Sequence, residues 1–388
     1  MIGDMNMGRR LKLLDLTFLL GAVAASAFTG CAGMDNALDG AADSGIADET
    51  NDPGDDAFVP PDKPDQIVPA TEDACDTENV VELDVAIGDT NATAGPALAR
   101  FLIERGRRVT HGIRVQEFLN YYSFDYGPPA PDGVAVSLEL DQGADGATYD
   151  LQVGVRVAGQ SATDRRPHNL TLVVDAADTM SGTPIQRVKQ GCVAVANVLA
   201  DGDLLSLVSS SSGQQVLLST HAVDGPGDET AIERCNSLVA GGATDLHEAL
   251  VTAYELAEAG RAPERNNRVV LLTDGNAGAT VEDVALIAQQ ADSADAPIQL
   301  MVAGVGNDSN PTAYDDRLLS ALSDAAQGAY GCIDSAGEAA AVFGEGLLGH
   351  VGIAGREIQV ELTVPPTFEL AAAVMAEVVS APPALPPQ

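Results

Sequence analysis

The spacing of apolar residues changes at about residue 168. Beyond that point, short apolar runs alternate with longer segments in which apolar residues recur every three or four positions. The first pattern is typical of buried strands, and the second is typical of helices packed on a sheet. The predicted strands are 170–175, 204–209, 214–219, 269–274, 298–305 and 329–334, and the predicted helices are 184–199, 230–239, 245–259, a segment capped by Thr280, 315–326 and 339–350.

This alternation predicts an α/β fold over residues 168–350, with a doubly wound, mostly parallel six-stranded sheet flanked by helices, as in Rossmann-like domains. The runs 204–209 and 214–219 are joined by Ser-Ser-Ser-Gly, which predicts a hairpin at the sheet edge. Aromatic residues make up only 4% of the chain and Trp is absent. The core must therefore be built from Val, Leu, Ile and Ala, which suits a parallel sheet covered by helices.

Residues 79–159 predict a small accessory α+β region. The segments 97–105 and 115–122 have helical spacing, whereas 134–140 and 149–157 alternate at period two around a Gly-rich turn and predict a hairpin. Near the other end of the chain, 357–364 also alternates at period two. We expect a C-terminal strand within 355–366 that packs on the accessory region by pairing with that hairpin, followed by an Ala/Pro-rich tail over 367–388.

The N-terminus has the organisation of an export signal. A basic stretch, Arg9–Lys12, precedes the apolar run 16–28, which is shorter than the roughly 20 residues of a membrane-spanning helix. Thr-Gly-Cys follows and resembles a bacterial lipobox. We therefore expect residues 1–31 to be a lipoprotein signal peptide, with acylated Cys31 anchoring the protein in the bacterial cell envelope, at the periplasmic face or the cell surface; plain secretion is the alternative.

Charge separates the next segment from the rest of the chain. Residues 32–78 contain fourteen Asp and Glu and a single basic residue, Lys63, so they cannot bury enough apolar area to fold and predict a disordered linker. The whole chain has a formal net charge of −37. This balance argues against nucleic acid and against electrostatic binding to anionic lipid, because both require basic patches.

Four cysteines follow Cys31, and their even number allows three pairings in an oxidising compartment. Cys192 and Cys235 lie on apolar faces of predicted helices, and Cys332 lies in a predicted strand, so we expect these three to be buried free thiols. The remaining one, Cys75, lies in the acidic linker. No CxxC spacing is present, which argues against a thiolate zinc site.

Oxygen-bearing residues gather where ligands bind in parallel sheets, beyond the carboxyl ends of the strands. Two predicted strands end in Asp175 and Asp274, and the first is followed by Ala-Ala-Asp-Thr-Met. A separate loop, Gly241–Thr244, precedes a predicted helix. We expect these loops to meet at one edge of the sheet.

These residues resemble the metal-ion-dependent adhesion site of von Willebrand factor type A domains, whose pattern is Asp-x-Ser-x-Ser, a Thr from a Gly-Gly-x-Thr loop, and an Asp before Gly. The resemblance implies Mg²⁺ or Mn²⁺ at Asp175, Thr179, Thr244 and Asp274, consistent with the preference of such ions for oxygen. Ala177 replaces the first Ser and supplies no oxygen. Its neighbour Asp178 either compensates as a carboxylate or serves as an ordinary loop or capping residue.

Residues 80–365 also resemble bacterial YfbK-type von Willebrand A lipoproteins, in Arg-Val-Gln-Glu-Phe-Leu-Asn-Tyr-Tyr from Arg114 and in the order of the later motifs. The resemblance implies a membrane-tethered module that binds an unidentified protein, through a divalent cation and an acidic residue of that partner. The alternative is a metal-independent scaffold or envelope-assembly component. We expect no enzymatic activity, because the histidines form no recognisable catalytic arrangement: His111, His168, His221, His247 and His350.

Overall fold

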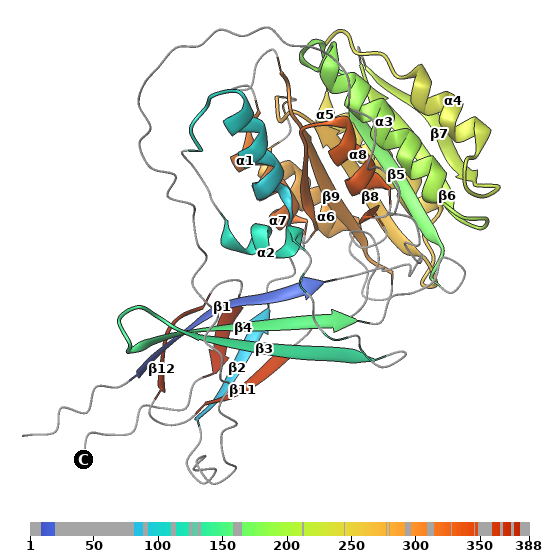
Figure 1. The fold of residues 1–388 in the computed structure, drawn as a ribbon. Coiled ribbons are helices and arrows are strands. Elements are labelled where there is room, and N and C mark those ends of the chain that lie inside the picture. The colour runs from blue at the N-terminus through green and yellow to red at the C-terminus, as the bar shows by residue number, and fades with distance from the viewer. Residues whose placement is uncertain are drawn as a thin grey trace, which may run out of the picture.

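The computed structural model describes residues 9–19, 81–87 and, with gaps that include Thr244 and residues 158–164, 309–313 and 348–358, residues 92–380. Its largest unit is a six-stranded sheet in the order β10-β9-β8-β5-β6-β7 (Figure 1). Every neighbouring pair is parallel except β6 and β7, which form the expected antiparallel edge hairpin. The strands are β5 (His168–Asp175), β6 (Leu204–Ser210), β7 (Gln214–Ala222), β8 (Asn266–Thr273), β9 (Ile298–Val305) and β10 (Tyr330–Ile333).

Helices cover both faces of this sheet, which confirms the predicted fold class. In β5, Leu172 and Val174 belong to one core and Val173, between them, belongs to the other. The first core includes residues of α3, α4 and α8, and the second includes residues of α5, α6 and α7. These helices are α3 (Thr183–Val198), α4 (Glu229–Ser237), α5 (Leu246–Ala259), α6 (Val281–Ala291), α7 (Asp316–Ala325) and α8 (Ala336–Phe343).

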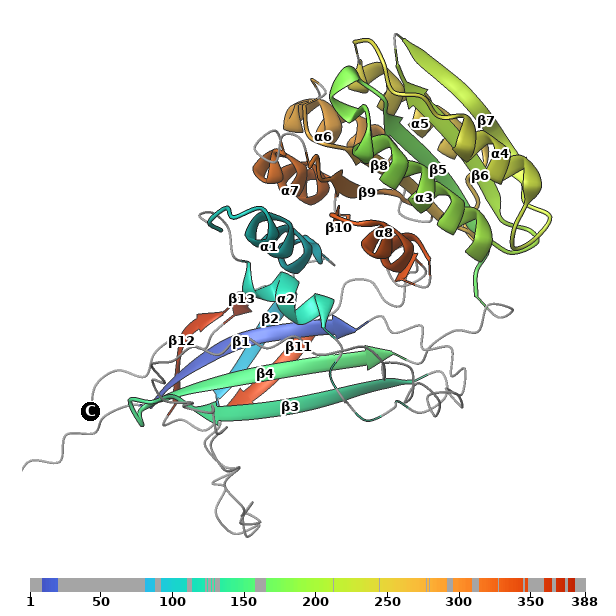
Figure 2. The ribbon, with the colours of Figure 1, turned by 45° about the horizontal axis from the view of Figure 1, so that its top comes forward.

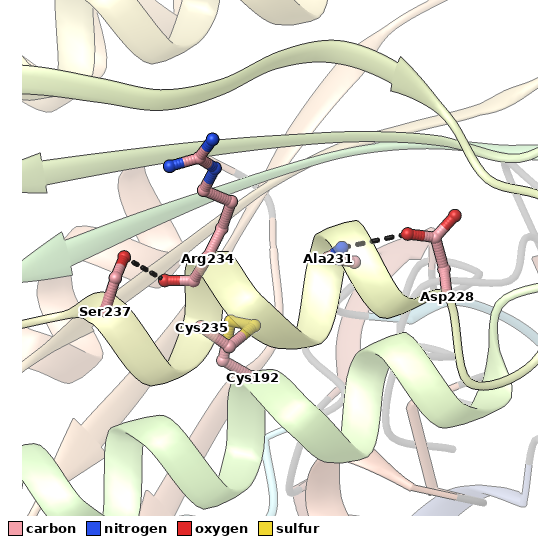
Figure 3. The surroundings of a disulfide bond; sticks show 6 residues. All are labelled: Cys192, Asp228, Ala231, Arg234, Cys235 and Ser237. Carbon is pink, nitrogen blue, oxygen red and sulfur yellow. Dashed lines mark hydrogen bonds between the residues drawn. A yellow bond between two sulfur atoms is a disulfide. The ribbon is translucent and has the colours of Figure 1, made fainter.

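A disulfide between Cys192 and Cys235 joins α3 to α4 (Figure 3). The prediction that both were buried free thiols was therefore wrong. Helical periodicity correctly placed each residue on a buried face, but it could not reveal that these faces pack against each other across 43 residues of sequence. Cys332, in contrast, is a buried free thiol as expected, and burial raises its pKa to about 12.

Helix α1 (Ala94–Glu104) packs on the main sheet at its β10 edge. It contributes Ala94 and Ala97 to the core that contains Tyr330, and the backbone N–H of Thr93 donates to the Tyr330 carbonyl at 2.7 Å. Helix α2 (Val115–Tyr121) lies between α1 and the accessory strands (Figure 2).

Arginine side chains connect these helices to distant parts of the chain. Arg100 of α1 pairs with Asp334 at 2.7 Å and with Glu338 at 2.6 Å. Arg114, at the start of α2, pairs with Glu117 at 2.5 Å and with Asp316 of α7 at 2.8 Å. The helices of the accessory region are thus joined to the main domain by both apolar and ionic contacts.

Two further sheets complete the described accessory structure. Strands β3 (Val134–Gln142) and β4 (Thr148–Val157) form the predicted hairpin within a sheet of order β12-β1-β4-β3. The expected C-terminal strand is β11 (Gln359–Val364), but it pairs with β2 (Val81–Ile87) and not with the hairpin, in a sheet of order β11-β2-β13. Period-two alternation identified the strand, but both candidate partners share that pattern.

The terminal segments differ in part from expectation. Strands β12 (Phe368–Ala373) and β13 (Ala376–Ser380) lie in the segment predicted to be an Ala/Pro-rich tail. Residues Arg9–Leu19 of the predicted leader form β1, which pairs in parallel with β4 and β12. Cys31 and the acidic linker 32–78 lie outside the described residues. Within the part that is described, none of the helices has the length and hydropathy needed to cross a membrane.

Candidate functional site

Two buried carboxylates mark the carboxyl ends of adjacent parallel strands. Asp175 is the last residue of β5, and Asp274 directly follows β8. The register pairs Val174 with Leu272, so both strands end at the same edge of the sheet. Neither carboxylate residue is exposed to solvent. The structure thus brings together the two strand-end aspartates that the sequence singled out.

Asp175 is held by hydrogen bonds from both sides. Its Oδ1 accepts from the backbone N–H of Ala177 at 3.0 Å, and its Oδ2 accepts from the hydroxyl of Thr273 at 2.6 Å. The Thr273 hydroxyl in turn accepts from the N–H of Gly275 at 3.1 Å. Because Thr273 immediately precedes Asp274, this chain of bonds fixes the end of β8 against the end of β5.

The Gly-Gly loop closes onto the loop that follows β5. The N–H of Gly241 donates to the carbonyl of Ala176 at 2.8 Å, and the N–H of Asp178 donates to the carbonyl of Gly242 at 3.2 Å. In return, the N–H of Gly242 donates to Asp178 Oδ1 at 2.8 Å. Gly242 has a φ of +86°, a conformation that side-chain-bearing residues rarely adopt. The exposed Asp178 therefore closes this pair of loops.

Asp274 contains an unsatisfied oxygen. Its Oδ1 accepts from the N–H of Asn276 at 3.0 Å, but its buried Oδ2 has no hydrogen-bond partner among the described residues. Leaving a buried carboxylate oxygen unpaired is costly, because the group has lost its water and gained nothing in exchange. A bound cation would remove that cost.

Two threonine hydroxyls, those of Thr179 and Thr244, were expected at this edge of the sheet. Thr179 is exposed in the short 3₁₀ helix η2 (Asp178–Met180), and its carbonyl accepts from Asn307 Nδ2 at 2.9 Å. Thr244 lies outside the described residues, two positions beyond the placed Gly242. Ala177 lies between Asp175 and Thr179, where the adhesion-site pattern has its first Ser. Among the described residues, no group of three or more His, Cys, Asp or Glu is placed to hold a metal, so any site here depends on hydroxyl oxygens as well.

Sequence reasoning missed two residues that organise this edge. Thr273 ends a run of aliphatic residues, and its polar side chain at the strand terminus was the available signal. Asn307 follows β9 in a Val-Gly-Asn turn that gave no sign of a long-range role. Its partner Thr179 is 128 residues away, and local patterns carry no information at that separation.

Comparison with known proteins identifies the central unit. Residues 169–323 match the von Willebrand factor type A domain family. The chain contains a von Willebrand factor type A domain. The match runs from β5 into α7, so it includes Asp175, the Gly-Gly loop and Asp274 and leaves out the accessory helices.

Two curated relatives extend the likeness beyond this domain. An uncharacterised Synechocystis protein, sll0103, is 27% identical over 226 residues, which are 58% of this chain and 51% of that protein. The uncharacterised protein YfbK of Escherichia coli is 21% identical over 295 residues, 72% of this chain and 49% of that protein. The chain thus spans about half the length of the curated relatives it matches.

The chain is also similar, at lower sequence identity, to several solved structures. A von Willebrand factor type A protein from Catenulispora acidiphila has a TM-score of 0.42 at 19% identity, covering 58% of this chain and 51% of that one. Proximal thread matrix protein 1 from the mussel byssus, in a form described as having a zinc-occupied MIDAS motif, has a TM-score of 0.36 at 14% identity, covering 46% of each chain.

Proposed function

We propose that this chain is a membrane-tethered binding module whose von Willebrand factor type A domain recognises a partner protein at the carboxyl edge of its sheet. Domains of this family are protein-interaction modules and commonly bind a metal ion at this edge. The observation that carries the proposal is the buried Oδ2 of Asp274, which has no hydrogen-bond partner among the described residues. It lies beside Asp175, at the place where the loop after β5 meets the Gly-Gly loop.

A divalent cation fits this edge in part. Asp175 and Asp274 with the hydroxyls of Thr179 and Thr244 would hold Mg²⁺ or Mn²⁺, ions that favour oxygen ligands and keep some waters. The bound ion would supply an open coordination position for an acidic side chain of the partner. Ala177 has no side-chain oxygen to act as a ligand, so the affinity for the cation is expected to be weaker than that of a site with the full Asp-x-Ser-x-Ser pattern.

Isothermal titration with Mn²⁺ and Mg²⁺ tests the cation. We expect millimolar or tighter binding to the full chain and its loss in Asp274→Asn, which keeps the shape of the side chain but removes its charge. Asp145→Asn is the matched control, because Asp145 lies in the turn between β3 and β4, where it accepts hydrogen bonds from Ala147 and Thr148. Partner capture from an envelope extract should fall with chelator and in Asp274→Asn, but not in Asp145→Asn.

A metal-independent scaffold is the second candidate. Two observations favour it. Ala177 has no side-chain oxygen to act as a ligand. In addition, hydrogen bonds between Asp178 and Gly242 join the loop after β5 to the Gly-Gly loop without an ion. No heat of binding at millimolar Mn²⁺, with partner capture insensitive to chelator, would leave this candidate and reject the cation.

The tether is supported by the leader sequence and by the disulfide. Disulfides such as Cys192–Cys235 persist in oxidising compartments, which include the bacterial periplasm and the cell surface. Mass spectrometry of the mature N-terminus is the direct test, with an acylated Cys31 expected. An unmodified Cys31, or a mature chain that still contains Arg9–Leu19, would reject the lipid anchor.

A further inference from the structure

The segment that follows β9, Gly306–Asp308, is bonded to the loop that carries Thr179. Asn307 Nδ2 donates to the Thr179 carbonyl at 2.9 Å. Arg187 of α3 donates to the Gly306 carbonyl at 2.5 Å and, through Nη2, to both carboxylate oxygens of Asp308 at 3.1 and 3.0 Å. Because α3 begins just after the loop, these bonds fix the loop at Thr179 and at the helix that follows it.

The same segment contacts accessory helix α1. Arg105, the C-cap residue directly after α1, donates to Asp308 Oδ1 and also to the Phe101 carbonyl at 2.9 Å. The Arg105 guanidinium lies 3.9 Å above the centre of the Phe101 ring. Phe101 is fully buried, and a Cβ atom built on Gly306 would approach its ring to 2.7 Å, so helix and segment are in close contact.

Asp308 is the charged junction of these contacts. Burial acts to raise its pKa, but hydrogen bonds and charges from Arg105 and Arg187 outweigh it and lower the pKa below the usual value. The carboxylate therefore stays ionised between two guanidinium groups, one from α1 and one from α3. Arg187 is buried, which keeps its end of the junction in place.

We propose that Asn307 and Asp308 are positioning residues of the candidate site, and that Arg105 extends their support to α1. On this proposal, which rests on the proposed function, affinity at the sheet edge depends on a helix outside the matched domain. The physical reason is that the position of the Thr179 hydroxyl is set by the Thr179 backbone, which is held by its hydrogen bond from Asn307.

Hydrogen exchange in the full chain tests this positioning without any ligand. Four amides of the loop are bonded, those of Ala177, Asp178, Met180 and Ser181. We expect their exchange to be about fivefold faster in Arg105→Gln and in Asn307→Ala, the factor expected for one lost hydrogen bond. Arg105→Lys, which keeps a cation beside Asp308, should stay close to the wild type.

Arg100→Gln is the matched control. Arg100 anchors the same helix to Asp334, Glu338 and Tyr121, and none of these bonds involves Gly306–Asp308. We expect this variant to leave exchange in the loop unchanged. Equal exchange rates in Arg100→Gln and Arg105→Gln would overturn the proposal. If both rates rise, the cause is a general loosening of α1; if neither rises, Arg105 does not support the loop.

Mn²⁺ titration of the same variants supplies the second readout. Arg105→Gln and Asn307→Ala should weaken Mn²⁺ binding roughly tenfold, as is common when a residue that supports a ligand is removed. Wild-type affinity in both variants would overturn the coupling to the site. Should the wild type bind no Mn²⁺, the cation proposal fails by itself, and the exchange measurement still decides whether the segment positions the loop.

Discussion

At the scale of single residues, the proposed cation site makes a specific prediction for Ala177, which has no side-chain oxygen. This residue lies between Asp175 and Thr179, and its backbone conformation (φ −59°, ψ 168°) is open to any side chain. We predict that Ala177→Ser restores the missing oxygen and tightens Mn²⁺ binding roughly tenfold, measured by isothermal titration. Ala177→Val adds volume without oxygen and should not tighten binding. Equal affinities for the two variants would show that this position does not contribute a ligand.

His168 predicts a pH dependence of stability. It is buried at the start of β5, and neither ring nitrogen has a partner among the described residues. Burial first, and then the charges of Arg165 and Arg268, lower its pKa to about 4, although Asp203 opposes the shift. The folded protein therefore binds this proton less readily than the unfolded chain, whose histidine titrates near its ordinary pKa of about 6.5.

This difference in pKa makes the folded protein less stable as the pH falls. Between about pH 6.5 and pH 4 the unfolded chain binds more protons than the folded protein, so the contribution of His168 to the unfolding free energy is fully present above this window and is lost as the pH falls through it. A shift of this size corresponds to about 3 kcal/mol. Urea unfolding from pH 7 to pH 4 should show a shallower loss of unfolding free energy in His168→Leu than in the wild type. The same slope in both proteins would contradict the assignment to His168.

How much of the site could be predicted from sequence depends on the range of each interaction. Asp175 and Asp274 follow apolar runs, so local pattern alone located them at strand ends. The Gly-Gly loop was predicted by its resemblance to the family. Thr273 and Asn307 were not found, because one acts on a neighbouring strand and the other on a residue 128 positions away. Positioning contacts of this kind depend on the folded arrangement.

At the scale of elements, the disulfide joins two helices that flank the candidate site in sequence. Helix α3 follows the loop that carries Thr179, and α4 ends shortly before the Gly-Gly loop. Both sulfur-bearing residues are buried, 1% and 0% exposed, so mild reductants should not reach the bond in the folded protein. The crosslink closes a loop across 43 residues of sequence, and loops of this length restrict the unfolded chain substantially.

We predict that the double variant Cys192→Ala/Cys235→Ala loses about 2–4 kcal/mol of unfolding free energy, measured by urea denaturation. Cys332→Ala is the control, because it removes a buried sulfur without removing a crosslink. A smaller loss is expected there, from packing alone. Comparable losses in the two proteins would mean that the bond contributes little beyond the volume of its sulfur atoms.

Individual strands and helices were more predictable than the pairing between strands. Each strand of the main sheet and each helix that covers it was found because the spacing of apolar residues is a local property of the sequence. The capping of α6 was also local, and Thr280 and Asp283 bond each other's backbone and side chain as the spacing suggests. Pairing is not local. The prediction joined the strand now seen as β11 to the β3–β4 hairpin, whereas it pairs with β2.

At the scale of the whole molecule, helix α1 and the von Willebrand factor type A domain share one core. Ala94, Ala97 and Phe101 of α1 are fully buried, and Ala94 and Ala97 lie in the core that includes Tyr330 and Cys332. Arg100 adds ion pairs with Asp334 and Glu338. A boundary drawn by family similarity at residue 169 therefore cuts through a continuous packed unit.

This packing predicts that the matched domain is incomplete by itself. A fragment of residues 165–347 should unfold at a lower urea concentration than a fragment of residues 92–347, because removing α1 exposes the apolar surface along β10. Both fragments contain Cys192 and Cys235, so the crosslink is common to the two.

Cys332 provides a specific reporter, since this residue is 1% exposed in the complete chain and burial raises its pKa to about 12. Under native conditions a thiol-reactive dye should label it in the short fragment and spare it in the long one. Equal midpoints together with an unreactive Cys332 in both fragments would mean that α1 contributes little to the core and that the family boundary is also a folding boundary.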